Sequence, residues 1–392
     1  RLGLGSTEVR MAWRLQFCAG FLDHCKDCSS SRSNTYGANS HGQLALGYVN
    51  ELCVTPQEVS KISFTPGAVR CIRGGGGHVL VLDTSGQVHS CGWNNRGQLG
   101  VDCTDDKHEF ICIPREYFKN APVEYIACGW DTSGAITADK ELFLWGSNGF
   151  HQLGFCKRHY TSVNKPLNLA LPLKETPVQI SFGLHHCCIL TEENKVYVLG
   201  KLKIKEVNAD LTISPVQFSN MQALKIQTDL KINAVVCGQN HFLLVTCDYR
   251  RIIGVGDNKY GQANLYCFDD KIKYAECGWT HNGILTKTKE VYLWGRNCYG
   301  QIGEPQRDSI QIPTKLCLED GDTPTQMHLG SEHGIAVSKG KKVYTWGWNE
   351  HGNCGNGRTE NVYFPSIVNL PAPCRIVGTG AGFCYAIFFT LN

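Results

Sequence analysis

The sequence predicts an all-β fold, a closed propeller of seven four-stranded blades, and two repeated patterns carry this prediction. A glycine turn of the form Gly92-Trp93-Asn94-Asn95-Arg96-Gly97-Gln98 returns along the chain. Its leading glycines are spaced 39 to 56 residues apart, at Gly37, Gly92, Gly146, Gly200, Gly256, Gly295 and Gly347. A glycine followed three residues later by histidine or a substitute recurs in phase, from Gly75, Gly129, Gly183, Gly238, Gly278, Gly330 and Gly380. A period of this size indicates one supersecondary unit copied around a ring.

Each unit reads as about four short strands. Residues 69–72, 78–82 and 87–91 are apolar or alternate polar with apolar, and glycine-containing turns separate them. A final strand is expected near a proline, as at Pro215 and Pro365. One four-stranded sheet alone leaves its faces uncovered, whereas a radial arrangement lets the sheets cover one another. The alternative, an open solenoid, would need distinct capping units at both ends.

The two ends of the repeat predict how the ring closes. The chain enters inside a third strand at residues 35–37 and leaves in a second strand at residues 385–389. We therefore expect the C-terminal strands to pair with residues 33–37, which makes residues 33–392 one propeller and leaves residues 1–32 as an irregular N-terminal segment. The unit after Gly256 spans only 39 residues, so one shortened blade, without its outer strand, is expected.

Composition excludes several classes of function. The net charge of +3 is too small and too evenly spread for a nucleic-acid-binding surface. No run of 18 apolar residues is present, so no membrane insertion is expected. The 21 cysteines are scattered, which is typical of small buried side chains in a reducing compartment. These features favour a cytoplasmic monomer.

No enzyme constellation stands out. The sequence has no P-loop, no Gly-x-Ser-x-Gly elbow and no His-Glu-x-x-His, so neither covalent catalysis nor a cofactor is predicted. The run His185-His186-Cys187-Cys188 suggests metal, but His186 and Cys188 occupy strand positions that other repeats share. Cys25 and Cys28 have no second pair. We therefore predict no metal site, and we interpret the recurring histidines and Trp145, Trp294 and Trp346 as structural.

The two loop residues between each glycine and histidine vary from unit to unit. Loops on a rigid scaffold commonly carry recognition, and tryptophans with acidic and amide neighbours are typical of a binding hot spot. The candidate partner-binding residues are Trp130, Asp131, His185, Gln239, Asn240, Trp279, Thr280, Ser331 and Glu332. A second face, carrying Trp93, Trp348, Glu350 and His351, is the alternative.

The pattern Trp-Gly-x-Asn-x-x-Gly-Gln-Leu-Gly, followed by Cys-Gly-x-x-His, resembles the repeat of the regulator of chromosome condensation family. The resemblance covers the chain from Tyr36 to the C-terminus, and residues 73–78, 127–131, 277–281 and 344–352 look like one branch of that family. It implies a cytoplasmic and nuclear guanine nucleotide exchange factor for a small GTPase, linked to the exocyst and to secretion.

The family's founding member meets its GTPase with acidic residues in these loops, which implies a partner contact for Asp131 and, by similar placement, Glu332. The alternative is a scaffold or adaptor that binds an exocyst subunit without exchange activity. The founding member's basic tail is not visible here, so chromatin binding is not carried over.

Overall fold

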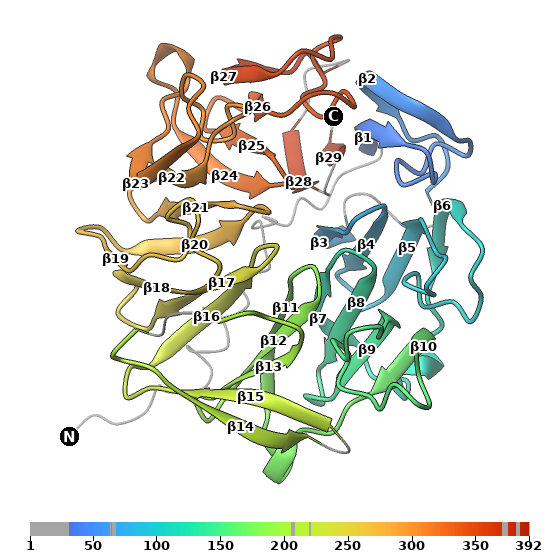
Figure 1. Ribbon diagram of the computed structural model, residues 1–392. Coiled ribbons are helices and arrows are strands. Elements are labelled where there is room, and N and C mark those ends of the chain that lie inside the picture. Colours follow the sequence, from blue (N-terminus) through green and yellow to red (C-terminus); the bar gives the residue numbers. More distant parts are fainter. Residues whose placement is uncertain are drawn as a thin grey trace, which may run out of the picture.

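Strands dominate the computed structural model, which describes residues 31–62, 64, 68–204, 208–218, 221–370, 375–381 and 385–391. Within these ranges the strands form seven antiparallel sheets arranged around a central axis (Figure 1). Six sheets have four strands and one has five. No helix among the described residues has the length and apolarity needed to cross a membrane.

The first four sheets follow one another along the chain, and the strands of each are named in spatial order. The sheet that contains both ends of the repeat consists of β2 (Asn50–Glu58), β1 (Ser31–Asn39), β29 (Tyr385–Leu391) and β28 (Arg375–Ala381). The next consists of β3 (Val69–Gly74), β4 (His78–Asp83), β5 (Val88–Gly92) and β6 (Lys107–Cys112). The third consists of β7 (Val123–Cys128), β8 (Thr132–Thr137), β9 (Leu142–Ser147) and β10 (Ser162–Asn168). The five-stranded sheet consists of β11 (Pro177–Phe182), β12 (His186–Thr191), β13 (Val196–Gly200), β15 (Met221–Gln227) and β14 (Thr212–Phe218).

Three further sheets complete the circle. They are β16 (Ile232–Cys237), β17 (His241–Thr246), β18 (Arg251–Gly256) and β19 (Tyr266–Cys267); β20 (Ile272–Cys277), β21 (His281–Thr286), β22 (Val291–Arg296) and β23 (Ser309–Lys315); and β24 (Pro324–Leu329), β25 (His333–Ser338), β26 (Val343–Gly347) and β27 (Val362–Ile367). Short 3-10 helices lie at η2 (Arg115–Phe118), η3 (Pro172–Lys174) and η4 (Glu319–Gly321).

The ring is sealed by the pairing that the sequence predicts. Strand β1 lies antiparallel to β29, with Ser33 opposite Phe389 and Gly37 opposite Tyr385. The first strand of each sheet along the chain, with β28 for the closing sheet, is innermost, and neighbouring inner strands touch all the way round, from β3 to β24 and on through β28 back to β3. The predicted irregular segment spans residues 1–32. Only its last two residues, which begin β1, belong to the described part of the chain, and the rest lies outside it.

The prediction of seven four-stranded blades is wrong, because only six sheets follow that plan. In the remaining sheet the hairpin β14–β15 follows β13, so β15 takes the fourth place and β14 adds a fifth strand at the edge. Pro215 lies in β14, where a missing backbone N–H costs no ladder bond on the outer side. The blade expected to lack its outer strand keeps a remnant, the two-residue β19, which pairs with Arg251 and Ile252.

The asparagine of the glycine turn distinguishes the other copies from the one in that sheet. Asn94 is fully buried, accepts a hydrogen bond from the Leu99 N–H at 2.9 Å, and donates to the carbonyls of Cys103 and Asp105. Asn148 makes the equivalent bonds in the next sheet. The copy at Gly200 has no such asparagine, and its chain reaches the edge of the sheet through the extra hairpin.

The motif tryptophans pack between sheets, as predicted. Trp145, Trp294 and Trp346 have no exposed surface. The indole N–H of Trp145 donates to the Gln98 carbonyl of the preceding sheet, and that of Trp346 to the Gln301 carbonyl, each at 2.9 Å. These hydrogen bonds link adjacent sheets, and the indole rings fill the space between the sheets.

Candidate partner-binding face

The two sequence motifs meet at one end of the propeller, which we call the loop face. The carbonyl of Asp131 accepts a hydrogen bond from the Ser147 N–H at 2.9 Å, and that of Glu332 accepts one from the Trp348 N–H at 2.8 Å. Corresponding bonds join Gly77 to Trp93, His185 to Lys201, Asn240 to Asp257 and Thr280 to Arg296. Each therefore links the Gly-x-x-His loop to the residue after the third-strand glycine.

Close approach of these two segments explains the motif glycine. At Gly92 φ is +102°, and a Cβ atom there would lie 2.3 Å from the Gly77 carbonyl oxygen. Such a position excludes any larger residue. It follows that Trp93, Trp348, Glu350 and His351 do not form a separate face: the glycine turns that carry them lie at the same end as the predicted loops.

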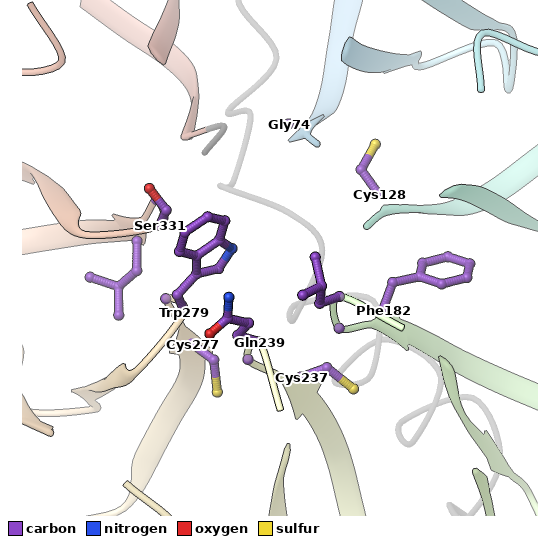
Figure 2. Close-up of a pocket in the computed structure, with 14 residues that line it drawn as sticks. Gly74, Cys128, Phe182, Cys237, Gln239, Cys277, Trp279 and Ser331 are labelled. Carbon is purple, nitrogen blue, oxygen red and sulfur yellow. The ribbon is translucent and has the colours of Figure 1, made fainter. Parts of the chain in front are cut away.

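A belt of backbone hydrogen bonds joins the first loop residues around the mouth of the central channel. The N–H groups of Leu184, Gln239 and Trp279 donate to the carbonyls of Gln239, Trp279 and Ser331 in turn, at 2.8–3.0 Å. The Gly76 N–H donates likewise to the Trp130 carbonyl. A cavity of about 90 Å³ lies inside this belt, with Gln239, Trp279 and Ser331 in its wall (Figure 2).

Three tryptophans span the channel mouth, and we call them the tryptophan bridge. The rings of Trp93 and Trp130 lie 6.3 Å apart edge to face, and those of Trp130 and Trp279 lie 5.7 Å apart. Trp130 follows β7 whereas Trp279 follows β20, two strands of sheets that are not neighbours in the ring. All three side chains are partly exposed, so the centre of the loop face is aromatic. His41 stacks on Trp93 at its margin.

Asp131 stands beside the bridge and is partly exposed. Burial raises the pKa of its carboxyl, while a hydrogen bond with Ser147 and the nearby Arg96 guanidinium oppose that shift. Arg96 is exposed. The loop face thus offers an acidic and a basic group next to an aromatic surface.

Glu332 is placed differently, because its carboxylate is used inside the chain. It is 4% exposed and forms an ion pair with the Arg296 guanidinium at 3.1 Å. Gln301 and Thr280 also donate to it. Burial raises the pKa of Glu332, and Arg296 opposes that shift. The Glu332 and Thr280 side chains therefore stabilise the loop through contacts within the chain.

The remaining predicted residues lie around the same face. His185 packs on the ring of Phe150, with centroids 3.8 Å apart, and burial lowers the pKa of its imidazole. Asn240 is exposed, and Ser331 is buried in the cavity wall. Sequence reasoning missed Phe150 and His41, and it assigned Trp93 to another face. The antiparallel order of the strands could have shown that the two motifs share one face, because the first and third connections of such a sheet emerge at the same end.

With this geometry established, comparison with known proteins defines the class. The sequence model of the RCC1-like domain family matches residues 33–388. The chain belongs to that family.

Among individual relatives, the chain is similar to the secretion-regulating guanine nucleotide exchange factors of Mus musculus and Bos taurus. The identities are 32% and 31%, over 90% of this chain and 82% of each relative. The resemblance predicted from the sequence is confirmed.

Solved structures share the fold. Prp20p from Saccharomyces cerevisiae, studied for its binding to Gsp1p and histones, superposes with a TM-score of 0.82 at 19% identity, covering 100% of this chain and 96% of that one. Human WBSCR16 superposes with a TM-score of 0.75 at 20% identity, over 93% and 99% of the two chains.

Proposed function

We propose that this protein binds a small GTPase through the loop face and promotes release of its nucleotide, as part of the regulation of secretion. The observation that carries the proposal is the similarity, over 90% of the chain, to relatives named as secretion-regulating guanine nucleotide exchange factors. The tryptophan bridge with Asp131 at its side supports it, because half-exposed aromatic residues next to a charged group are typical of binding hot spots.

Exchange of this kind needs no covalent chemistry. A protein that binds the nucleotide-free GTPase more tightly than the loaded form must weaken nucleotide binding by the same factor, since the coupling between two ligands is reciprocal. The hydrogen-bonded belt holds the loops in place before the partner arrives. The loop backbone then loses little conformational entropy on association, which favours affinity.

Release of fluorescent GDP from a panel of small GTPases tests the proposal. The wild-type chain should accelerate release from at least one of them, and Trp130→Ala and Asp131→Ala should lower that acceleration. Loss of a hot-spot residue costs about 2 kcal/mol or more, or roughly 30-fold. Ile312→Ala is the matched control, because Ile312 is exposed on the outer strand β23. Absence of acceleration by the wild type on every GTPase would reject exchange activity.

The second candidate is a scaffold that binds an exocyst subunit without exchanging nucleotide. It is favoured by the uneven loop face, since the copy at Gly200 lacks the asparagine turn and the Glu332 carboxylate is occupied internally. Recovery of exocyst subunits in a pull-down, lost in Trp130→Ala and accompanied by no exchange activity, would select this candidate. We further propose a cytoplasmic location with a nuclear pool, which imaging of the tagged chain at native level would test.

A further inference from the structure

Three side chains of the types that bind metals converge between the five-stranded sheet and its neighbour. His186 begins β12, Cys188 lies two residues on, and Cys237 ends β16. Their ligand atoms all lie within 4.8 Å of one another. Alternation along a strand puts His186 and Cys188 on the same face of β12, and that strand packs against β16.

His186, like His281, has a buried imidazole without hydrogen bonds. The residue is 1% exposed, and neither ring nitrogen has a hydrogen-bond partner. In two other sheets the equivalent imidazole reaches the next sheet: Nε2 of His78 lies 2.9 Å from Ser133 Oγ, and Nε2 of His241 lies 2.7 Å from Asn282 Oδ1.

The residue in the corresponding position for His186 cannot accept a hydrogen bond. It is Phe242, whose ring centroid lies 6.5 Å from that of the imidazole. A buried polar group without a partner is costly. The structure brings the sulfurs of Cys188 and Cys237 within 4.8 Å of the ligand nitrogen of this imidazole.

Within the described ranges, no other group of three or more His, Cys, Asp or Glu ligand atoms converges in this way. Cys128 and Cys277 end inner strands just as Cys237 does. The histidines that precede them in the ring, however, are followed two residues later by leucine, at Leu80 and Leu243. Those interfaces therefore supply two ligands, and their histidines are already hydrogen-bonded.

We propose that His186, Cys188 and Cys237 bind one zinc ion. Imidazole nitrogen and thiolate sulfur are ordinary zinc ligands, at about 2.0–2.1 and 2.3 Å. Two sulfurs on a tetrahedral zinc lie about 3.8 Å apart, so no pair of ligand atoms needs to approach by more than about 1 Å on binding. Because the two thiolates neutralise a divalent ion, the loaded site carries no net charge among apolar neighbours such as Val235 and Phe242.

One of the three ligands borders the central cavity. Cys237 is partly exposed and lies in the wall of the central cavity (Figure 2). His186 and Cys188 are buried. Zinc sites with three protein ligands commonly take water as the fourth ligand. The ion would also tie the five-stranded sheet to the next sheet, so its binding should stabilise the ring.

This site departs from the prediction of no metal. The sequence shows four consecutive candidates, His185 to Cys188, of which only two point to the site. The third ligand comes from Cys237, in the following repeat. Only the packing of two sheets reveals the set.

Zinc and cobalt binding to the intact chain test the proposal. The protein is stripped with a chelator, reloaded with Zn²⁺ or Co²⁺ under reducing conditions, and freed of excess metal by gel filtration. Mass spectrometry of the metal should find one zinc per chain, and cobalt should give thiolate charge-transfer bands. Cys188→Ser and Cys237→Ser should lose the cobalt bands and the zinc-induced rise in unfolding temperature. Cys187→Ser and Cys277→Ser, the matched controls, should keep both.

Thiol labelling of the wild type keeps the test decisive if a ligand variant does not fold. Zinc should protect two thiols, which peptide mapping should assign to Cys188 and Cys237. Less than stoichiometric zinc in the wild type, unchanged labelling of these two thiols, or binding of copper(I) without binding of zinc would overturn the proposal.

Discussion

The tryptophan bridge makes a measurable prediction about the centre of the loop face. The change is Trp130→Ala, Trp279→Ala and the two together in the intact chain. Replacing a fully buried tryptophan with alanine lowers the free energy of unfolding by about 3–5 kcal/mol. Because Trp130 and Trp279 are about half buried, each replacement should lower it by about 1.5–2.5 kcal/mol. The rings lie 5.7 Å apart across the channel, a geometry worth about 0.5–1.5 kcal/mol beyond area burial. The double variant should therefore lose less than the sum of the single losses, by about that amount.

Urea denaturation followed by circular dichroism measures the three losses against the wild type. Trp130→Ala combined with Phe364→Ala is the control, because Phe364 is exposed on the outer strand β27 and these two losses should add. Separate sites usually add within about 0.3–0.5 kcal/mol. If Trp130 and Trp279 also add within that margin, the cross-channel contact contributes nothing, and the loop face lacks a rigid aromatic centre.

Three further perturbations test the contacts between and within sheets. Trp346→Phe should lower the free energy of unfolding by about 1–3 kcal/mol more than Trp294→Phe, because both indoles are buried but only Trp346 donates a hydrogen bond; equal losses in urea denaturation would contradict this. Gly92→Ala should destabilise more than Gly321→Ala in thermal unfolding, since both have positive φ but only Gly92 would place a Cβ against a carbonyl oxygen. Burial lowers the pKa of His241 to about 4 from 6.5, so its contribution of up to about 3 kcal/mol is present above pH 6.5 and is lost as the pH falls towards 4. His241→Asn should flatten the pH dependence of the urea midpoint over that window, and an unchanged slope would refute it.

Much of the fold could be predicted because certain backbone positions can be occupied only by glycine, and glycine is visible in the sequence. Gly92 must be glycine wherever the third strand ends against a loop carbonyl, so the periodic spacing of such glycines marks each sheet. The pairing of β1 with β29 followed from where the chain enters and leaves the repeat. The fifth strand was not predicted, since the hairpin β14–β15 carries no repeated motif.

The candidate site was predicted less completely, because its residues are brought together by the ring. The loop positions of Trp130 and Trp279 were recognised, but nothing in their local sequence shows that the two rings touch across the channel. Glu332 looked available as an acid until the structure placed Arg296 beside it.

By itself, the sequence determined the repeat, the sheet-forming segments and the family, since backbone requirements and strand periodicity are local properties. Only the tertiary structure decided which side chains are accessible and which meet a partner from another sheet. Closing the ring places residues that are tens of positions apart, such as His186 and Cys237, against each other, and this contact depends on inter-sheet packing rather than on the spacing of the residues along the chain.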